Sequence, residues 1–326
     1  MRYDDKDRES KNVEDRRNSG GGFGFPGGRG LPIGGKGGLS ITTLLIIGAI
    51  MLLFGMNPLD LLRGGGGGGL PGGVSFDVPG MPTGGSARRT GGGGQYDIPG
   101  LPGSQKPQAT ESTDAKKVFI SRVLADTEDV WNRVFESFGK DYREPKLVLF
   151  RGYTRTGCGA GQAAMGPFYC PLDQKIYIDL AFYEQLKRQF NAPGDFAQAY
   201  VIAHEVGHHV QKQLGIADKV QQLKQRMSKR ESNALQVRME LQADCLSGVW
   251  ANLNDQLHNR LQQGDIHEGI NAAQQIGDDM IQKRQTGRVV PDAFTHGSAE
   301  QRVRWFMTGF ESGKMQVCDT FQADRL

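Results

Sequence analysis

Residues 204–208 read His204-Glu205-Val206-Gly207-His208, which is an H-E-x-x-H sequence. Two histidines four positions apart on a helix lie on the same face, so both imidazoles can reach one ion. Zinc suits imidazole nitrogen and accepts a tetrahedral site with one position left for water. Glu205 lies beside the histidines, where its carboxylate can act as general base on that water. The sequence therefore predicts one zinc ion bound by His204 and His208, with Glu205 as a catalytic residue.

The residues around this motif favour a helix. Asp195 is a typical N-cap and Gly215 is a typical helix end. Between them, six apolar residues recur at helical spacing: Phe196, Ala199, Tyr200, Ala203, Val206 and Val210. We therefore expect both histidines to lie on one helix with an apolar, buried face.

A second helix is expected over residues 235–253, where apolar residues again recur at helical spacing. Glu240 and Asp244 lie four apart on its other face, and their neighbours Ala243 and Cys245 indicate burial. Burying an unpaired acid is costly, so a buried pair needs partners; the alternative is a solvated helix face. A carboxylate downstream of H-E-x-x-H with an acid one turn later is typical of zinc peptidases whose third ligand is glutamate. We expect Glu240 to bind the zinc and Asp244 to hydrogen-bond the far ring nitrogen of a ligand histidine.

Three segments together resemble one bacterial family. They are Ala203–Val210, Glu240-Leu241-Gln242-Ala243-Asp244 and Gly166-Pro167-Phe168-Tyr169-Cys170-Pro171. They are similar to the neutral zinc metallopeptidases called YpfJ-like proteins, and the likeness covers nearly the whole chain. The resemblance implies an α+β, zincin-like peptidase domain, helical with a small mixed sheet. The E-x-x-A-D piece also resembles HtpX-type peptidases and, more distantly, gluzincins of the thermolysin type. These resemblances imply a peptide or protein substrate but do not say which one.

Two further expectations follow from these resemblances. The segment from His296 to Arg302 is similar to the His-Pro-Ser…Arg element of HtpX-type peptidases, whose histidine stabilises the oxyanion. Gly297 replaces the proline here, and the alternative for His296 is an ordinary surface loop. In gluzincins an edge strand above the zinc helix pairs with the extended substrate, and Ala163–Phe168 is the candidate for that strand.

A membrane helix is expected over residues 39–62. No residue from 37 to 59 is charged, and a helix of this length crosses a hydrocarbon core of about 30 Å. Basic residues precede this stretch closely, whereas only Arg63 follows it before Arg88. The positive-inside rule then predicts a single-pass protein of the inner (plasma) membrane, with a cytoplasmic N-terminus and a periplasmic catalytic domain.

Composition predicts how the remaining chain is organised. Residues 1–38 are charged and then glycine-rich, which predicts a disordered cytoplasmic tail. Residues 63–113 are rich in glycine and proline and predict a flexible linker. The zinc metallopeptidase domain is then expected over 114–326. We expect helices near 116–138, 180–193 and 265–285 and short strands at 146–150 and 175–179.

Charge and cysteine content limit the partners and the compartment. A net charge of +3 gives no indication of a nucleic-acid partner. The chain has four cysteines, an even number that allows two disulfides outside the cytoplasm. Cys158 and Cys170 span a short loop and favour one bridge, which leaves Cys245 and Cys318 for the second; free buried thiols are the alternative. A hairpin closed by Cys158 and Cys170 is compatible with the substrate-binding edge proposed above.

These patterns predict a membrane-anchored zinc endopeptidase. The alternative is a non-catalytic, zinc-stabilised module that binds envelope proteins. A structural zinc site normally has four protein ligands, and the three that are apparent here favour catalysis. We expect His209 to pack in the interior or to support a metal ligand, and we expect His267 and Glu268 to lie at the surface.

Overall fold

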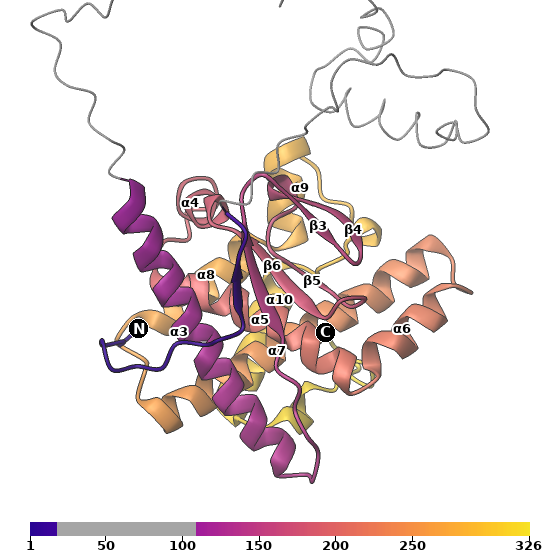
Figure 1. Cartoon of the computed structure of the whole chain (residues 1–326). Helices are drawn as coiled ribbons and strands as arrows, with labels where there is room; N and C mark the ends of the chain where they lie inside the picture. The colour runs from indigo at the N-terminus through magenta and orange to yellow at the C-terminus, as the bar shows by residue number, and fades with distance from the viewer. Residues whose placement is uncertain (18–108) are drawn as a thin grey trace, which may run out of the picture. The chain divides into compact units, whose positions relative to one another are not determined.

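The computed structural model describes residues 1–17 and 109–326 of the chain. Its frame is a four-stranded sheet in the order β1 (Val13–Asp15), β2 (Lys146–Phe150), β6 (Lys175–Asp179) and β5 (Phe168–Cys170). The first three strands are parallel, whereas β5 pairs antiparallel with β6. β5 is therefore an outer strand of this sheet (Figure 1).

The middle of the sheet is apolar on both faces. In β2, Leu147 and Leu149 belong to the main core, while Val148 and Phe150 belong to a smaller cluster. Successive side chains of a strand point to opposite faces, so both faces of β2 are covered. A strand buried on both faces has a continuous apolar run, which is why its sequence predicts a strand without alternation.

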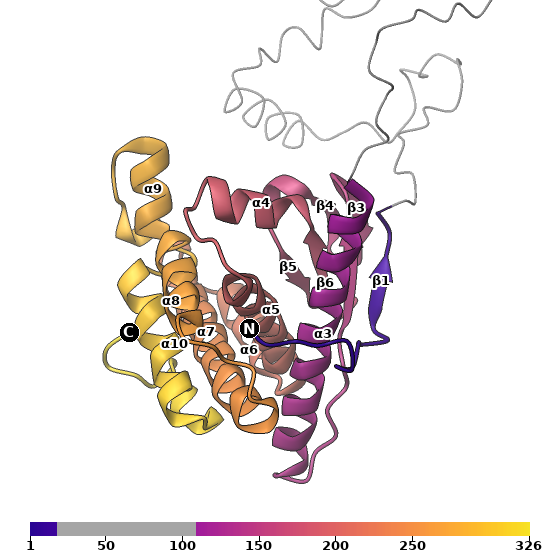
Figure 2. The ribbon, with the colours of Figure 1, turned by 90° about the vertical axis from the view of Figure 1, so that its left-hand side faces the viewer.

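The main core lies between the sheet and four long helices, α3 (Ala109–Glu136), α5 (Asp195–Gln213), α7 (Lys229–His258) and α10 (Ala299–Ser312). Figure 2 shows α5 between the sheet and the pair formed by α7 and α10. Large buried side chains from these helices fill the core, including Trp131, Phe196, Trp250 and Phe306. The helix that carries the H-E-x-x-H motif is therefore the central helix.

Helices α7 and α10 approach each other closely at two glycines. A Cβ atom at Gly248 would lie 2.0 Å from the carbonyl oxygen of Phe306, and one at Gly309 would lie 1.9 Å from that of Cys245. Only glycine fits at such positions. Next to this contact a disulfide joins Cys245 to Cys318 with an S–S distance of 1.99 Å, so α7 is tied to the C-terminal part of the chain.

Shorter elements surround this frame. A two-stranded hairpin pairs β3 (Tyr153–Thr156) with β4 (Gly159–Gln162), and Cys158 at its turn is disulfide-bonded to Cys170 at the end of β5. The other short helices are η1 (Ala163–Met165), α4 (Ala181–Arg188), α6 (Ile216–Lys224), α8 (Asp265–Gln275), α9 (Asp278–Thr286), η2 (Pro291–Ala293) and η3 (Met315–Cys318).

The predicted fold class, an α+β zincin-like domain behind one transmembrane helix, is wrong for this structure. The described residues are mostly helical, and the two sheets are small because their strands have only three to five residues. No helix within 1–17 and 109–326 combines the length and the apolar composition needed to cross a membrane. The predicted membrane helix at 39–62 lies outside the described residues, as does the predicted linker up to residue 108.

The first 17 residues, predicted to be part of a disordered tail, instead pack on the helical unit. Strand β1 lies beside β2, with Val13 opposite Leu147. Residues 1–17 therefore share one sheet with the rest of the described chain, where the sequence predicted disorder.

Polar contacts explain why the tail was mispredicted. The Arg8 guanidinium lies 2.7 Å from the buried carboxylate of Glu128 on α3. The backbone N–H of Ser10 donates to the carbonyl of Ser121 at 3.1 Å, and the Arg260 guanidinium lies 2.7 Å from Asp7. The low apolar content of this segment predicts disorder, but its charged residues find buried partners far away in the sequence.

Candidate metal centre

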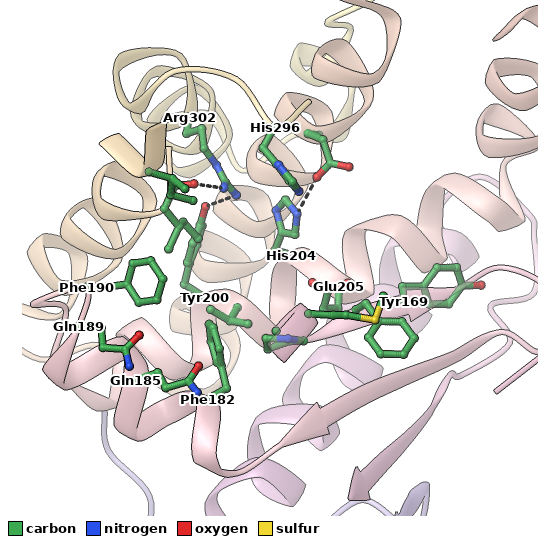
Figure 3. A pocket seen from close by; sticks show the side chains of 18 of the residues that line it. Tyr169, Phe182, Gln185, Gln189, Phe190, Tyr200, His204, Glu205, His296 and Arg302 are labelled. Atoms are coloured by element: carbon green, nitrogen blue, oxygen red, sulfur yellow. Dashed lines mark hydrogen bonds and ion pairs between the residues drawn. The ribbon is translucent and has the colours of Figure 1, made fainter. Parts of the chain in front are cut away.

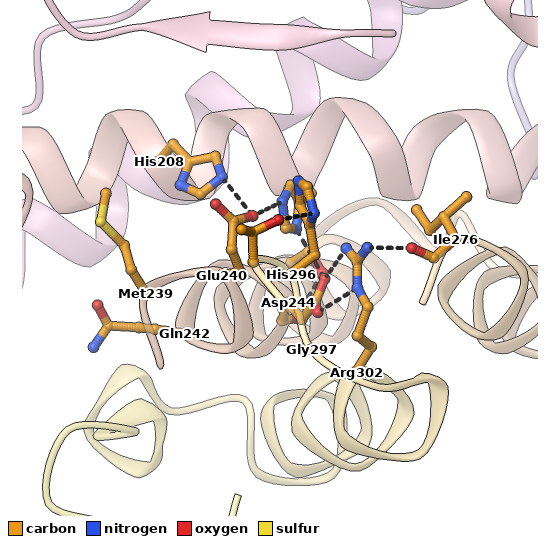
Figure 4. A network of polar contacts seen from close by, with 12 residues as sticks. His208, Met239, Glu240, Gln242, Asp244, Ile276, His296, Gly297 and Arg302 are labelled. Carbon is orange, nitrogen blue, oxygen red and sulfur yellow. Dashed lines mark hydrogen bonds and ion pairs between the residues drawn. The ribbon is translucent and has the colours of Figure 1, made fainter. Parts of the chain in front are cut away.

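Three predicted ligands converge between α5 and α7. The Oε2 atom of Glu240 lies 3.3 Å from the Nε2 atoms of both His204 and His208 (Figure 4), and the three ligand atoms lie within 4.8 Å of one another. Zinc bonds of about 2.0–2.1 Å in a tetrahedron give ligand-to-ligand distances of about 3.3 Å. The donor atoms therefore suit zinc in type, and both carboxylate-to-imidazole distances match a tetrahedral site.

A close contact between the two helices makes this convergence possible. A Cβ atom at Gly207, within the H-E-x-x-H motif, would lie 3.1 Å from the Cα and carbonyl oxygen of Ala243 on α7. The absent side chain lets the two backbones approach. Glu240 lies one turn before Ala243, so the approach brings its carboxylate within reach of the histidines.

Asp244 fixes the orientation of His204. Its Oδ1 atom lies 2.8 Å from His204 Nδ1, so the far ring nitrogen is occupied and Nε2 is left for the metal. The buried Arg302 guanidinium donates to both oxygens of Asp244 at 2.9 Å, and the hydroxyl of Tyr200 donates to Oδ1 at 2.6 Å. Asp244 has no solvent exposure, so these four hydrogen bonds are what make its burial tolerable.

Glutamine side chains orient the other two ligands. The Oε1 atom of Gln211 lies 2.9 Å from His208 Nδ1, and Gln211 donates through Nε2 to the carbonyl of Met239 at 2.7 Å. Gln236 donates through Nε2 to Oε1 of Glu240 at 2.7 Å and accepts from the Lys224 ammonium at 2.6 Å. One oxygen of Glu240 is thus held by Gln236, and the other faces the histidines.

The buried carboxylates make this site favourable for a cation. Burial by itself would lower the pKa of His204, but Asp244 and Glu240 outweigh it and raise that pKa to about 10. Burial would raise the pKa of Glu240, but His208 and His204 hold it well below its usual range. Both shifts have one physical cause, which is that the carboxylates attract positive charge to the ring nitrogens. A divalent ion supplies this charge when the imidazoles are neutral.

The predicted catalytic residues Glu205 and His296 line one cavity with these ligands (Figure 3). The cavity has a volume of about 600 Å³. His296 is held through Asp278, whose Oδ2 atom accepts from the backbone N–H groups of Thr295 and His296 at 2.6 Å. The Oδ1 atom of Asp278 lies 3.3 Å from His296 Nδ1, which leaves the other ring nitrogen for the cavity.

Position 297 is glycine here, where HtpX-type peptidases have proline, and the backbone conformation of the loop accounts for the difference. The φ angle of Gly297 is +97°, a left-handed conformation that favours glycine. Its backbone N–H also donates to Asp278, at 3.1 Å. The loop is therefore shaped by a glycine turn and a carboxylate clamp instead of a proline ring.

The predicted substrate-binding strand at Ala163–Phe168 is wrong in its position. Residues Ala163–Met165 form a 3-10 turn, and Gly166 follows with a φ angle of +74°. This turn and the adjacent Pro167 interrupt an extended run, so the outer strand starts only at Phe168. That strand, β5, packs on the metal helix, where the Tyr169 hydroxyl lies 3.0 Å from Nδ1 of His209.

The start of α5 also differs from the prediction. Gly194 is the N-cap and Asp195 is the first helical residue. Glu268, predicted to lie at the surface, instead accepts from the backbone N–H of Phe196 at 3.1 Å. A carboxylate at a helix N-terminus is favourable because of the unpaired N–H groups and the helix dipole.

Sequence reasoning did not assign roles to Tyr200, Gln211, Lys224, Gln236 and Asp278. Tyr200, Gln211 and Gln236 each carried a usable indication. They lie four residues before His204, three after His208 and four before Glu240 on the same helix. Arg302 was part of the segment that resembles HtpX-type peptidases, but its ion pair with Asp244 joins residues 58 apart in the sequence. Periodicity within one helix cannot indicate such a contact.

Comparisons with known proteins place the chain in one family. A sequence model of the family described as "Putative neutral zinc metallopeptidase" matches residues 1–75 and 81–321. "Uncharacterized protein YpfJ" of Escherichia coli K12 is 49% identical over 316 residues, which are 96% of each chain. "Uncharacterized protein Mb2605" of Mycobacterium bovis is 40% identical over 226 residues, covering 66% of this chain and 75% of that protein. No solved structure matches the chain.

Proposed function

The chain belongs to the neutral zinc metallopeptidase family, and on this premise we propose that it is a zinc-dependent endopeptidase of the gluzincin type. One observation carries the proposal. His204, His208 and Glu240 offer three donor atoms within 4.8 Å of one another, with the carboxylate oxygen 3.3 Å from both imidazole nitrogens, beside a cavity large enough for part of a peptide. A three-ligand site beside a cavity is typical of catalytic zinc.

Glu205 acts as the general base and then as the general acid. When bound, a zinc ion polarises the peptide carbonyl and lowers the pKa of water at the site. The Glu205 carboxylate accepts a proton as the water oxygen attacks the carbonyl carbon. As the C–N bond breaks, Glu205 delivers this proton to the leaving nitrogen, and a carboxylic acid and an amine are formed.

His296 stabilises the negative charge on the carbonyl oxygen. Its imidazole is anchored at Nδ1 by Asp278 and donates a hydrogen bond from the other ring nitrogen. A donor that is already in place when charge develops contributes more than one that must reorient. Asp278 thus acts through His296 as a positioning residue.

Strand β5 supports the binding of an extended peptide. It is an outer strand of the sheet and lies on the metal helix, where Phe168 and Tyr169 line the cavity. A peptide that adds to its open edge would satisfy backbone hydrogen bonds on one side. The Cys158–Cys170 disulfide anchors the end of β5. This bridge and the Cys245–Cys318 bridge favour an oxidising compartment as the place of action.

Replacement of the general base tests the proposed function in the full-length protein. Glu205→Gln should keep one zinc ion per chain and reduce hydrolysis of an unstructured protein substrate by about 10²–10⁴-fold. The control is Glu300→Gln, the same change at an exposed site, and it should retain both properties. Full activity of Glu205→Gln would refute the role of Glu205. Stoichiometric zinc without any cleavage by the wild type would support the zinc-stabilised binding module instead.

A further inference from the structure

The cavity extends beyond the metal ligands into a side recess. We use this name for the part lined by Phe182, Gln185, Gln189, Phe190, Val201, Ile276 and Ile281. Figure 3 shows Phe182, Gln185 and Phe190 at the end of the cavity away from Tyr169. The side recess is therefore formed by α4, the segment after it, α5 and the region from the end of α8 into α9.

The side recess starts one helical turn from the metal. Val201 precedes His204 by three residues on α5, so both side chains lie on the same face of the helix. One turn of a helix rises about 5.4 Å, and neighbouring residues of an extended peptide are about 3.3 Å apart. When a peptide carbonyl lies at the metal, the side chain of a flanking residue can therefore reach the side recess.

The walls of the side recess lack acidic side chains. Helix α4 directs Phe182 and Gln185 toward the cavity while Tyr183 and Leu186 are buried on its other side. Within the described residues that line the cavity, the carboxylates are those of Glu205 and Glu240, and both lie at the metal site. Nothing in the side recess would therefore neutralise a basic substrate side chain.

The positive charge at the rim of the side recess already has partners. The Arg284 guanidinium donates to the carbonyls of Met280 at 3.2 Å, Gln189 at 3.3 Å and Gln275. It also lies 5.0 Å from the centre of the Phe190 ring. Arg284 thus closes the recess as a structural clamp, and its charge disfavours lysine or arginine there.

We propose that the side recess is a specificity pocket for a large uncharged apolar side chain next to the scissile bond. The substrates would be polypeptides with leucine, methionine or phenylalanine at that position. This proposal rests on the zinc endopeptidase function proposed above. It adds a preference for one class of side chain next to the cleaved bond, which the endopeptidase function by itself does not require.

Cleavage of an unbiased peptide library by the zinc-loaded full-length protein tests this preference. Mass spectrometry of the products should show one position beside the cleaved bond at which leucine, methionine or phenylalanine is favoured over alanine by about 10–200-fold. Lysine and arginine should be disfavoured at that position. Cleavage without such a preference, or with a preference for charged residues, would overturn the specificity pocket and leave the endopeptidase function standing.

Ile281→Asp changes the side recess without touching the metal ligands. Ile281 is only partly buried on α9, so this variant should fold, and its new carboxylate should remove the apolar preference and permit lysine or arginine. The matched control is Val317→Asp, which introduces the same charge at a 36% exposed residue outside the cavity. The control should keep the wild-type preference. An unchanged preference in Ile281→Asp would contradict the proposal.

A binding measurement separates this proposal from catalysis. Calorimetry of the zinc-loaded protein should show that a leucine hydroxamate binds more tightly than a glycine hydroxamate by about 10–200-fold. Ile281→Asp should abolish this difference, and Val317→Asp should keep it. Equal affinities in the wild type would overturn the specificity pocket even if no peptide were cleaved, whereas a leucine preference without peptide cleavage would refute only the endopeptidase function.

Discussion

Gln236 should control zinc affinity although it does not bind the metal. Its amide donates to Oε1 of Glu240 at 2.7 Å and is itself held by the Lys224 ammonium at 2.6 Å. Gln236→Leu has similar size but no donor, so Oε1 of a 6% exposed carboxylate loses its partner. Glu240 can then rotate away from the position in which Oε2 faces both histidines.

The expected magnitude follows from the kind of hydrogen bond that is lost. A hydrogen bond to a charged group contributes about 1.5–3 kcal/mol, and loss of a partner that orients a ligand typically lowers metal affinity by about 10–100-fold. The two ranges agree, because a tenfold change in affinity corresponds to about 1.4 kcal/mol and a 100-fold change to about 2.8 kcal/mol. Lys224→Met should have a smaller effect, since Lys224 acts on Glu240 only through Gln236.

Competition with a chromophoric chelator would measure the zinc dissociation constant of each variant. The control is Gln256→Leu, the same substitution at an exposed position of the same helix, and its affinity should equal that of the wild type. The visible spectrum of the cobalt-substituted protein should also change in Gln236→Leu, because the coordination geometry changes. A zinc affinity within threefold of the wild type, with an unaltered cobalt spectrum, would refute the reasoning.

Four further predictions concern stability. Deletion of residues 1–17 should lower the melting temperature, and an unchanged melting temperature would show that the N-terminal contacts are dispensable. Arg260→Met should lower the free energy of unfolding in urea by about 3–5 kcal/mol, because it leaves the buried carboxylate of Asp126 without its guanidinium partner. Replacing both Cys245 and Cys318 with serine should cost about 4 kcal/mol, since the bridge closes a loop with a separation of 73 residues, and calorimetry under oxidising conditions would measure it. Burial lowers the pKa of His209 to about 4, below the value of about 6.5 in an unfolded chain. The contribution of neutral His209 to the free energy of unfolding is therefore complete above pH 6.5. It decreases by about 1.4 kcal/mol per pH unit as the pH falls toward 4. In His209→Phe this loss should be absent when unfolding of the zinc-free proteins is compared across that pH range.

The convergence of the candidate metal ligands follows in part from their spacing in the sequence. His204 and His208 share a helix face by their four-residue separation, and Glu240 and Asp244 repeat this spacing on a second helix. The contact between the two helices was not directly predictable, but two buried acids on an apolar helix need a positive partner. In the structure these acids lie 3.3 Å and 2.8 Å from the ring nitrogens of His204.

Residues 1–17 show why another part of the fold could not be predicted. Their composition indicates disorder because they contain too little apolar surface to form a core. They pack through long-range contacts instead. Some are apolar, since Met1 belongs to the main core, and others are polar, such as the one from Arg8 to Glu128, which are separated by 120 residues. The composition of a segment indicates how much apolar surface it could bury by itself. It does not indicate which buried charged residues elsewhere in the chain it could pair with.

The position of the outer strand was mispredicted for a local reason. Composition and alternation do not distinguish an extended backbone at Ala163–Phe168 from a turn. Gly166 adopts a left-handed φ angle of +74°, and Pro167 follows it. Glycine followed by proline is a turn indication, and giving it more weight would have shifted the predicted edge to Phe168–Cys170.

Asp244 shows why the metal site and the fold depend on the same atoms. This residue of α7 accepts hydrogen bonds from Tyr200 and His204 of α5 and from Arg302 of α10. Since its carboxylate is fully buried, the position of the three helices is favourable only when all of these donors are in place. The contact that orients a ligand imidazole therefore also fixes how α5, α7 and α10 pack. It follows that substitutions at this carboxylate should affect zinc affinity and unfolding together, whereas those at Gln236, near the start of α7, should affect zinc affinity with little change in the stability of the zinc-free protein.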